Sequence, residues 1–148
     1  MTPRQTFDRY FGECPLIAII RGVTPPEAAG IARALFEAGI RIVEVPLNSP
    51  EPFASIEAIA GELGEEALVG AGTVLDPADV ERVKKAGGRI VVSPNTDRAV
   101  IQATVAAGLV SSPGFFTPSE ALLALQAGAH ALKFFPAEAA APKVVKAI

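Results

Sequence analysis

The chain repeats one pattern: an apolar run of strand length, a helix start made from a capping residue with proline, and a helix that ends near Ala-Gly. Successive strand-like runs begin about 20–26 residues apart, at Leu16, Ile42, Leu68, Ile90, Leu109 and Ala131. No hairpin turn separates them. Strands that alternate with helices in this way form a parallel sheet with right-handed crossovers. The repeat therefore predicts an α/β fold.

Two parallel architectures fit such a repeat. The doubly wound fold reverses its winding direction and often carries a GxGxxG turn, which Gly70-Ala71-Gly72-Thr73 does not complete. The regular period favours a TIM (β/α)8 barrel instead. Only about six βα units are present, and six units cannot close the cylinder. We therefore expect residues 1–148 to form a single, incomplete barrel domain, shortened from a longer protein, with an open apolar edge at Leu132 and Phe134.

Composition narrows the functional classes. The 148 residues carry a net charge of −3, with a pI of about 5.2 and no basic cluster, so neither nucleic acid nor an anionic membrane is an expected partner. No apolar run approaches the roughly 20 residues of a membrane span. Residues 1–13 lack the apolar core of a signal peptide, and a lone Cys14 fits a reducing compartment, so we expect the cytoplasm. Phe7, Tyr10 and Phe11 recur at helical spacing and predict a helix that packs an aromatic face on the domain.

The last apolar run carries a single lysine. In Ala131-Leu132-Lys133-Phe134-Phe135-Pro136, strand alternation puts Lys133 on one face with Ala131 and Phe135. Burial lowers the pKa of a lysine by as much as about 3–5 units and makes its amine a nucleophile near neutral pH. Two interpretations follow from these residues: a Schiff-base lysine, or a lysine at a strand end that reaches water.

A glutamate lies in the middle of the second strand. Glu44 shares a face with Ile42 and Pro46, which alternation points into the barrel. A buried carboxylate requires a partner or a function. Glu44 either pairs structurally with Arg21 or acts as a general acid/base whose pKa is raised by apolar surroundings. Lysine, glutamate and arginine on one inward layer are the minimum set for carbonyl chemistry on an anionic substrate.

The carboxyl ends of barrel strands converge on the active site. In this chain they carry Arg21, Glu44, Asn48, Gly72-Thr73, Pro94-Asn95, Pro113-Gly114 and Lys133. Other polar residues have simpler interpretations. His130 is expected to be a surface or strand-start histidine, and Asp76, Thr117 and Ser119 are expected to begin helices.

Five segments resemble the KDPG/KHG aldolase family, which are class I keto-deoxy-phospho-sugar aldolases. The segments are Leu16–Gly22, Val43–Pro50, Val69–Leu75, Val92–Asn95 and Leu132–Glu138. The resemblance runs from about Leu16 to the last residue, with the motifs in order and at matching spacing. Asn48 follows a leucine where phosphogluconate enzymes of the family typically have arginine. This makes the chain more similar to the phosphogalactonate enzymes.

The resemblance implies a role for each site residue. Lys133 would form the Schiff base, and Glu44 would move protons as the C3–C4 bond breaks. Arg21 and Thr73 would hold the pyruvyl carboxylate. The other implied substrate-binding residues are Gly72 by close backbone approach, Asn48, the pocket-lining Pro94 and Pro113, and Phe135 as a cover that keeps the lysine dry.

The resemblance also implies the reaction, which is cleavage of 2-dehydro-3-deoxy-6-phosphogalactonate to pyruvate and D-glyceraldehyde 3-phosphate. The alternative substrate is its epimer, 2-dehydro-3-deoxy-6-phosphogluconate. No metal and no cofactor are expected, because the iminium is the electron sink, and a homotrimer is implied for the full-length protein. The phosphate site of the family lies after strands seven and eight, so no residue here is assigned to it. An alternative of another class is a barrel that binds a sugar phosphate without a covalent step.

Overall fold

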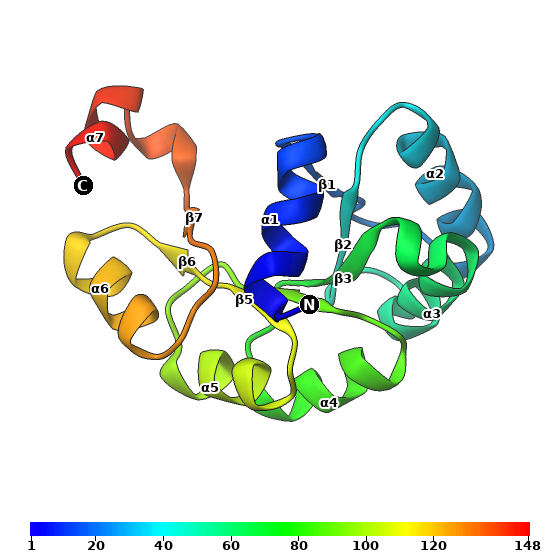
Figure 1. Cartoon of the computed structure of the whole chain (residues 1–148). Helices are drawn as coiled ribbons and strands as arrows, with labels where there is room; N and C mark the ends of the chain where they lie inside the picture. Colours follow the sequence, from blue (N-terminus) through cyan, green and yellow to red (C-terminus); the bar gives the residue numbers. More distant parts are fainter.

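A computed structural model describes residues 1–148. Five parallel strands form one sheet in chain order: β1 (Ile17–Ile19), β2 (Ile42–Pro46), β3 (Leu68–Gly72), β4 (Ile90–Val92) and β5 (Val110–Ser112). A second parallel sheet pairs β6 (Gly114–Phe115) with β7 (Lys133–Phe134). The winding direction never reverses (Figure 1), which confirms the α/β prediction and distinguishes the fold from a doubly wound sheet.

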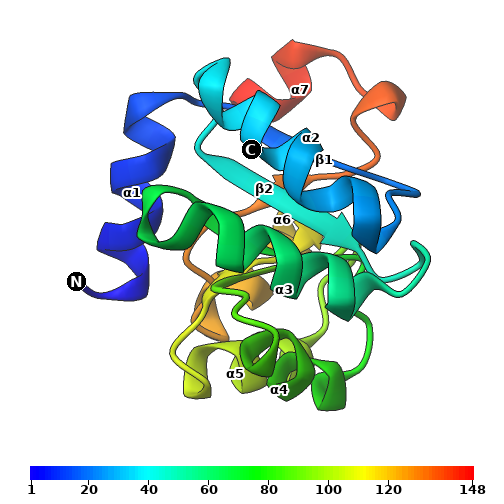
Figure 2. The ribbon, with the colours of Figure 1, turned by 90° about the vertical axis from the view of Figure 1, so that its right-hand side faces the viewer.

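Helices follow the strands in the predicted alternation. They are α2 (Pro25–Glu37), α3 (Pro52–Leu63), α4 (Pro77–Lys85), α5 (Arg98–Ala106), α6 (Pro118–Gln126) and α7 (Pro142–Ala147), with 3₁₀ turns η1 (Gly64–Glu66) and η2 (Ala137–Ala139). α2 and α3 pack side by side (Figure 2). None of these helices combines the length and apolar character that crossing a membrane requires.

Two helices begin later than the sequence predicts, since it places one start at Ser49-Pro50-Glu51 and the other at Asn95. α3 starts at Pro52, because the Ser49 hydroxyl is engaged elsewhere and accepts a hydrogen bond from the Gly22 N–H at 3.0 Å. Its N-cap is Glu51, in the left-handed region at φ 42°. α5 starts at Arg98 rather than near Asn95, because the Asp97 carboxylate accepts the free N–H groups of the first turn.

Strands β2 to β5 are buried on both faces of the sheet, whereas β1 at its edge is only partly buried. The outer face of the sheet packs against α2–α5 in a cluster that includes Val45, Ile56, Ile59 and Val69. Its inner face carries a separate cluster centred on Ile42, Leu68, Ile90 and Val110. Each of these four residues stands near the start of its strand, so the inner cluster fills the amino-terminal end of the incomplete barrel.

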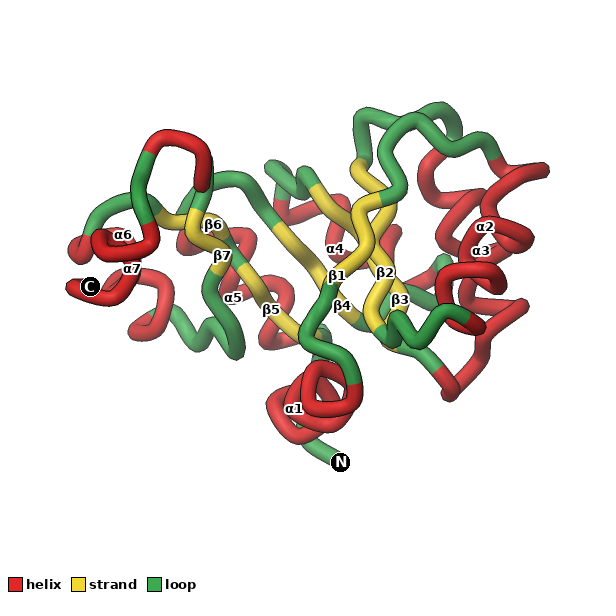
Figure 3. The backbone as a smooth tube through the Cα atoms, turned by 90° about the horizontal axis from the view of Figure 1, so that it is seen from above, coloured by secondary structure: helices red, strands yellow, loops and turns green.

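One helix covers this inner end. α1 (Pro3–Glu13) buries Phe7 and Tyr10 against the inner cluster, as the helical spacing predicted. Phe11 stacks on Phe7 with ring centroids 5.2 Å apart and stays partly exposed. Seen from above, α1 stands apart from the other helices, next to β1 and β5 (Figure 3).

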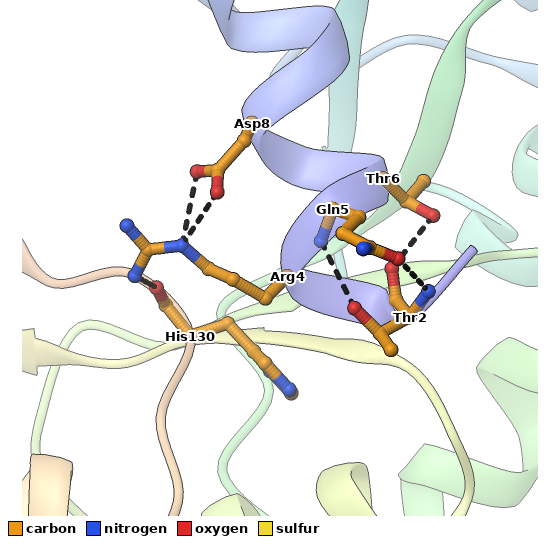
Figure 4. A network of polar contacts seen from close by, with 6 residues as sticks. All are labelled: Thr2, Arg4, Gln5, Thr6, Asp8 and His130. Atoms are coloured by element: carbon orange, nitrogen blue, oxygen red, sulfur yellow. Dashed lines mark hydrogen bonds and ion pairs between the residues drawn. The ribbon is translucent and has the colours of Figure 1, made fainter.

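Polar contacts attach α1 to the chain just before β7 (Figure 4). Thr2 and Gln5 form a capping box at the helix start. Arg4 pairs with the Asp8 carboxylate and donates a hydrogen bond to the carbonyl of His130 at 2.8 Å. His130 also accepts the Ser111 N–H on Nδ1 at 3.0 Å, so it is a strand-start histidine, as predicted. Burial, followed by the Arg4 charge, lowers the pKa of His130.

The fifth strand ends at Ser112, as the run Leu109-Val110-Ser111-Ser112 predicts, and a further short strand follows Pro113. Pro113 has no N–H to donate, so β5 ends at Ser112 and the chain resumes as β6. Alongside it, the N–H groups of Ala131, Lys133 and Phe135 donate in turn to the carbonyls of Ser111, Pro113 and Phe115, at 3.1, 2.9 and 3.0 Å. This even spacing is that of a parallel ladder. The predicted lysine strand is therefore present as a ladder, although only Lys133–Phe134 is regular strand.

Candidate active site

A cavity of about 340 Å³ opens between α1, the inner face of the sheet and β7. Ten residues line it: Phe7, Phe11, Ile17, Ile19, Glu44, Val92, Ser112, Ala131, Leu132 and Lys133. Seven are apolar, and the three polar ones come from β2, β5 and β7. The lysine and the glutamate identified in the sequence therefore share one largely apolar chamber.

Glu44 is the most deeply buried ionisable group of the site. Its side chain is 2% exposed, and its Oε2 atom has no hydrogen-bond partner. Burial raises the pKa of Glu44 to about 7, against the opposing charges of Lys133 and then Arg21. A carboxyl group that exchanges its proton near neutral pH is suited to general acid/base chemistry. It is not the ion pair with Arg21 that a purely structural role would need, because no salt bridge joins them.

Lys133 is held by its backbone at the edge of the structure. Its N–H donates to the Pro113 carbonyl, and its side chain is half-buried, as the predicted open edge implies. The ammonium nitrogen lies 5.1 Å from the ring centroid of Phe135. Phe135 is itself 40% exposed, so it covers the lysine only in part.

The strand on which the lysine lies is anchored by its neighbours. Leu132 packs against a small cluster of Ile101, Ala124 and Ala127 under α5 and α6. The Phe134 ring stacks on Phe116 and meets Phe115 edge-on. These contacts fix β7 to the α5–α6 side of the molecule.

The other predicted residues follow the strands at the same edge but lie outside the cavity wall. Arg21 is exposed two residues beyond β1, close enough for its charge to lower the Glu44 pKa. Thr73 follows β3, half-buried, with a φ of 55° that a branched residue seldom adopts. Asn48 is exposed in the turn after β2. None of these three lines the chamber.

Gly72, Pro94 and Pro113 occupy interior positions. Gly72 ends β3 directly against the Glu44 carboxyl group. Pro113 is buried and supplies the carbonyl that the Lys133 N–H reaches. The Pro94 carbonyl lies against the backbone of Gly114, where any side chain would collide with it. The two prolines thus support the strand ends, and neither lines the chamber.

Sequence reasoning missed most of the chamber wall. Phe7 and Phe11 were recognised as a packing face, but helical spacing does not tell which cavity that face borders. Ser112 had a detectable signal, since strand alternation puts it on the same face as Val110. No cluster of three or more His, Cys, Asp or Glu side chains is close enough to hold a metal ion.

Comparison with known proteins agrees with this geometry. The family model for KDPG and KHG aldolase matches residues 8–148. The chain belongs to the KDPG and KHG aldolase family. Members of this family are aldolases, which are carbon–carbon lyases, and the match extends through both Glu44 and Lys133.

Relatives within the family differ in their similarity to the chain. A probable 2-dehydro-3-deoxy-6-phosphogalactonate aldolase of Rhizobium meliloti (strain 1021) is 52% identical over 92% of this chain and 64% of its own length. The native KDPGal structure superposes with a TM-score of 0.89 at 47% identity, over 91% of this chain and 66% of that one. The structure of a KDPG aldolase from Legionella pneumophila, with pyruvate captured as a covalent carbinolamine, superposes with a TM-score of 0.86. It is 32% identical, over 99% of this chain and 69% of that one.

The similarity covers nearly all of this chain but only part of its relatives. The chain spans about 64% of the length of the Rhizobium relative. This agrees with the expectation of an incomplete barrel drawn from the count of βα units.

Proposed function

We propose that this protein is a class I aldolase that cleaves 2-dehydro-3-deoxy-6-phosphogalactonate to pyruvate and D-glyceraldehyde 3-phosphate. The observation that carries the proposal is that Lys133 and Glu44 line one largely apolar cavity, in which burial raises the pKa of Glu44 to about 7. That pairing supplies an amine nucleophile and a proton carrier to the same bound carbonyl compound.

In the proposed reaction, the neutral amine of Lys133 adds to the C2 ketone. Loss of water from the carbinolamine leaves an iminium ion. Glu44, as the carboxylate, then takes the proton of the C4 hydroxyl while the C3–C4 bond breaks. The electrons of that bond move into the iminium and form an enamine, and the aldehyde departs.

Glu44 closes the cycle in the opposite protonation state. The proton it gained is returned to C3 of the enamine, which restores the iminium. Addition of water to this iminium releases pyruvate and the free amine of Lys133. A carboxyl group with a pKa of about 7 has both forms available at neutral pH, as the two transfers require.

Substrate binding is proposed at the mouth of the cavity. Arg21 and Thr73 are assigned to the pyruvyl carboxylate, because the Arg21 charge acts on Glu44 and Thr73 follows Gly72, which lies against the Glu44 carboxyl group. Asn48 in the turn after β2, the strand-end prolines Pro94 and Pro113, and Phe135 beside the amine complete the proposed binding set. Gly72 is treated separately below.

The choice of epimer is supported by two observations. Asn48 stands where the phosphogluconate enzymes typically carry arginine, and the phosphogalactonate relative is 52% identical against 32% for the Legionella KDPG aldolase. The two substrates differ only at C4, the centre at which Glu44 acts. We expect kcat/KM for the phosphogalactonate to exceed that for the phosphogluconate.

Further expectations belong to this proposal. Residues 1–148 act as one barrel unit, the full-length protein is a homotrimer in the cytoplasm, and neither metal nor cofactor takes part. Light scattering during size-exclusion chromatography tests the trimer. A single cooperative melt of the 148-residue chain tests the single unit.

The half-reaction with pyruvate is the direct test, because it needs only groups that this chain contains. Incubation with pyruvate and borohydride should reduce the Schiff base and leave a stable adduct on the peptide that contains Lys133. Lys133→Met should abolish the adduct. Lys143→Met, which removes an exposed lysine of α7, is the matched control and should leave it unchanged.

A folded wild-type chain that yields no adduct on Lys133 would reject the covalent mechanism. The alternative function, a barrel that binds sugar phosphates without a covalent step, would then remain. An adduct of equal yield in the Lys133→Met variant would assign the chemistry to another lysine.

A further inference from the structure

We infer that Gly72 is a positioning residue whose missing side chain makes room for the Glu44 carboxyl group, an inference that rests on the proposed function. The sequence resemblance assigned this glycine to substrate binding. Its surroundings support a different role, because the space next to its α-carbon is occupied by the general acid/base itself.

The geometry is direct. A β-carbon built on Gly72 would lie 2.6 Å from Oε1 of Glu44, with Oε2 and Cδ closer still. Real β-carbons essentially never approach a heavy atom within 3.0 Å. All three nearest atoms belong to the Glu44 carboxyl group. Any residue other than glycine at this position would therefore have to displace the carboxyl group.

The carboxyl group has little else to hold it. Its Oε2 atom is buried without a hydrogen-bond partner, and Glu44 forms no salt bridge. Contact with the bare backbone of Gly72 therefore fixes where the carboxyl group lies. The same contact excludes water from that side, which maintains the burial that raises the Glu44 pKa.

The conformation of Gly72 does not itself require glycine. Gly72 is absent from the residues with positive φ and lies at the end of a regular strand, in register with Pro46. Glycine is required here because there is no space for a β-carbon. The atoms that fill this space belong to the Glu44 carboxyl group, which is the flexible end of a side chain and can move. Alanine should consequently be accommodated by the fold but should shift the carboxyl group away from the reacting carbon.

The test uses the 148-residue chain and pyruvate. Gly72→Ala should retain borohydride trapping on Lys133 within about twofold, since the amine is untouched. The rate at which the pyruvate methyl protons exchange in D2O, measured by NMR, should fall roughly 10²-fold. This is the lower end of the rate enhancement that a positioned general acid/base supplies. The pH profile of the residual exchange should lose its step near pH 7.

Two further variants make the result specific. Gly61→Ala adds the same methyl group on α3, where nothing lies within 4 Å, and should leave trapping and exchange at wild-type values. Glu44→Ala combined with Gly72→Ala should exchange no more slowly than Glu44→Ala alone, because the second change has no carboxyl group left to displace.

The possible outcomes separate the inference from the proposed function. Wild-type protein that forms no adduct would reject the proposed function itself. An adduct with normal exchange in Gly72→Ala would overturn the inference, and so would an equal loss of trapping and exchange. If Gly72→Ala fails to fold, the variant that also carries Glu44→Ala decides the matter. A folded double variant would support the overlap between the new methyl group and the Glu44 carboxyl group. A double variant that also fails to fold would overturn the inference.

Discussion

The β1–β5 sheet and the β6–β7 pair hold the two reactive groups in different ways. Every residue of β2 is buried, and Glu44 lies in a sheet packed on both faces. Both residues of β7 are half-buried, and Lys133 depends on a backbone ladder and on aromatic contacts with β6. The carboxyl group is positioned by a completed core, and the amine by an open edge. Changes in the two regions should therefore differ in size and kind.

Gly70→Ala should have the largest effect on stability. A β-carbon there would overlap the carbonyl oxygen of Ile90 and lie 2.7 Å from its Cγ2, so the main chain of β4 would have to move. We expect a loss of at least about 3 kcal/mol in the free energy of unfolding, or failure to fold. Urea denaturation followed by circular dichroism measures this. A urea midpoint close to that of the wild type would show that β3 and β4 are not packed tightly enough at Gly70 to exclude a methyl group.

A matched pair of leucines compares the two regions directly. Leu68 is fully buried in the inner cluster, and Leu132 is half-buried next to β7. Leu68→Ala should cost about 2–5 kcal/mol, and Leu132→Ala about 1–2 kcal/mol, because less apolar surface is lost at the edge. Denaturation curves of both variants under one set of conditions give the difference. Equal losses would mean that the edge is as well packed as the sheet.

A third stability effect concerns the Glu44 charge and depends on pH. The folded-state pKa is raised from 4.5 to about 7, so the folded chain binds the proton more tightly, and stability falls as pH rises through this window. Wild type should lose about 2–3 kcal/mol between pH 5 and pH 8 from this group, and Glu44→Gln should lack that loss. The stability difference between the two proteins, measured at both pH values, tests it. A difference that does not change with pH would place the Glu44 pKa near its ordinary value.

Much of the fold could be predicted, because the repeat is periodic. Strand starts, the aromatic face of α1 and the inward direction of Glu44 follow from spacing alone. The end of the fifth strand before Pro113 was predicted, but the short strand β6 beyond it was not, since a proline that follows a strand also suits a turn. The later start of α3 involves the long-range hydrogen bond between Ser49 and Gly22, which local sequence does not encode, whereas that of α5 follows from the local cap by Asp97.

The site was predictable to the level of the reacting pair and no further. Alternation tells which face a side chain takes, so Lys133 and Glu44 could be identified, and the structure brings both to one cavity. Strand alternation does not tell which atom fills the space beside a glycine. The contact between Gly72 and the Glu44 carboxyl group required the packed structure.

The hydrogen bond from Arg4 to His130 spans 126 positions of the chain, nearly its whole length. During synthesis the first helix leaves the ribosome long before the lysine strand exists, and proteins of this kind grow by only about 5–20 residues per second. The contact between Arg4 and His130 must therefore wait several seconds, whereas the aromatic face of α1 can pack on β2–β5 as each of these strands is made.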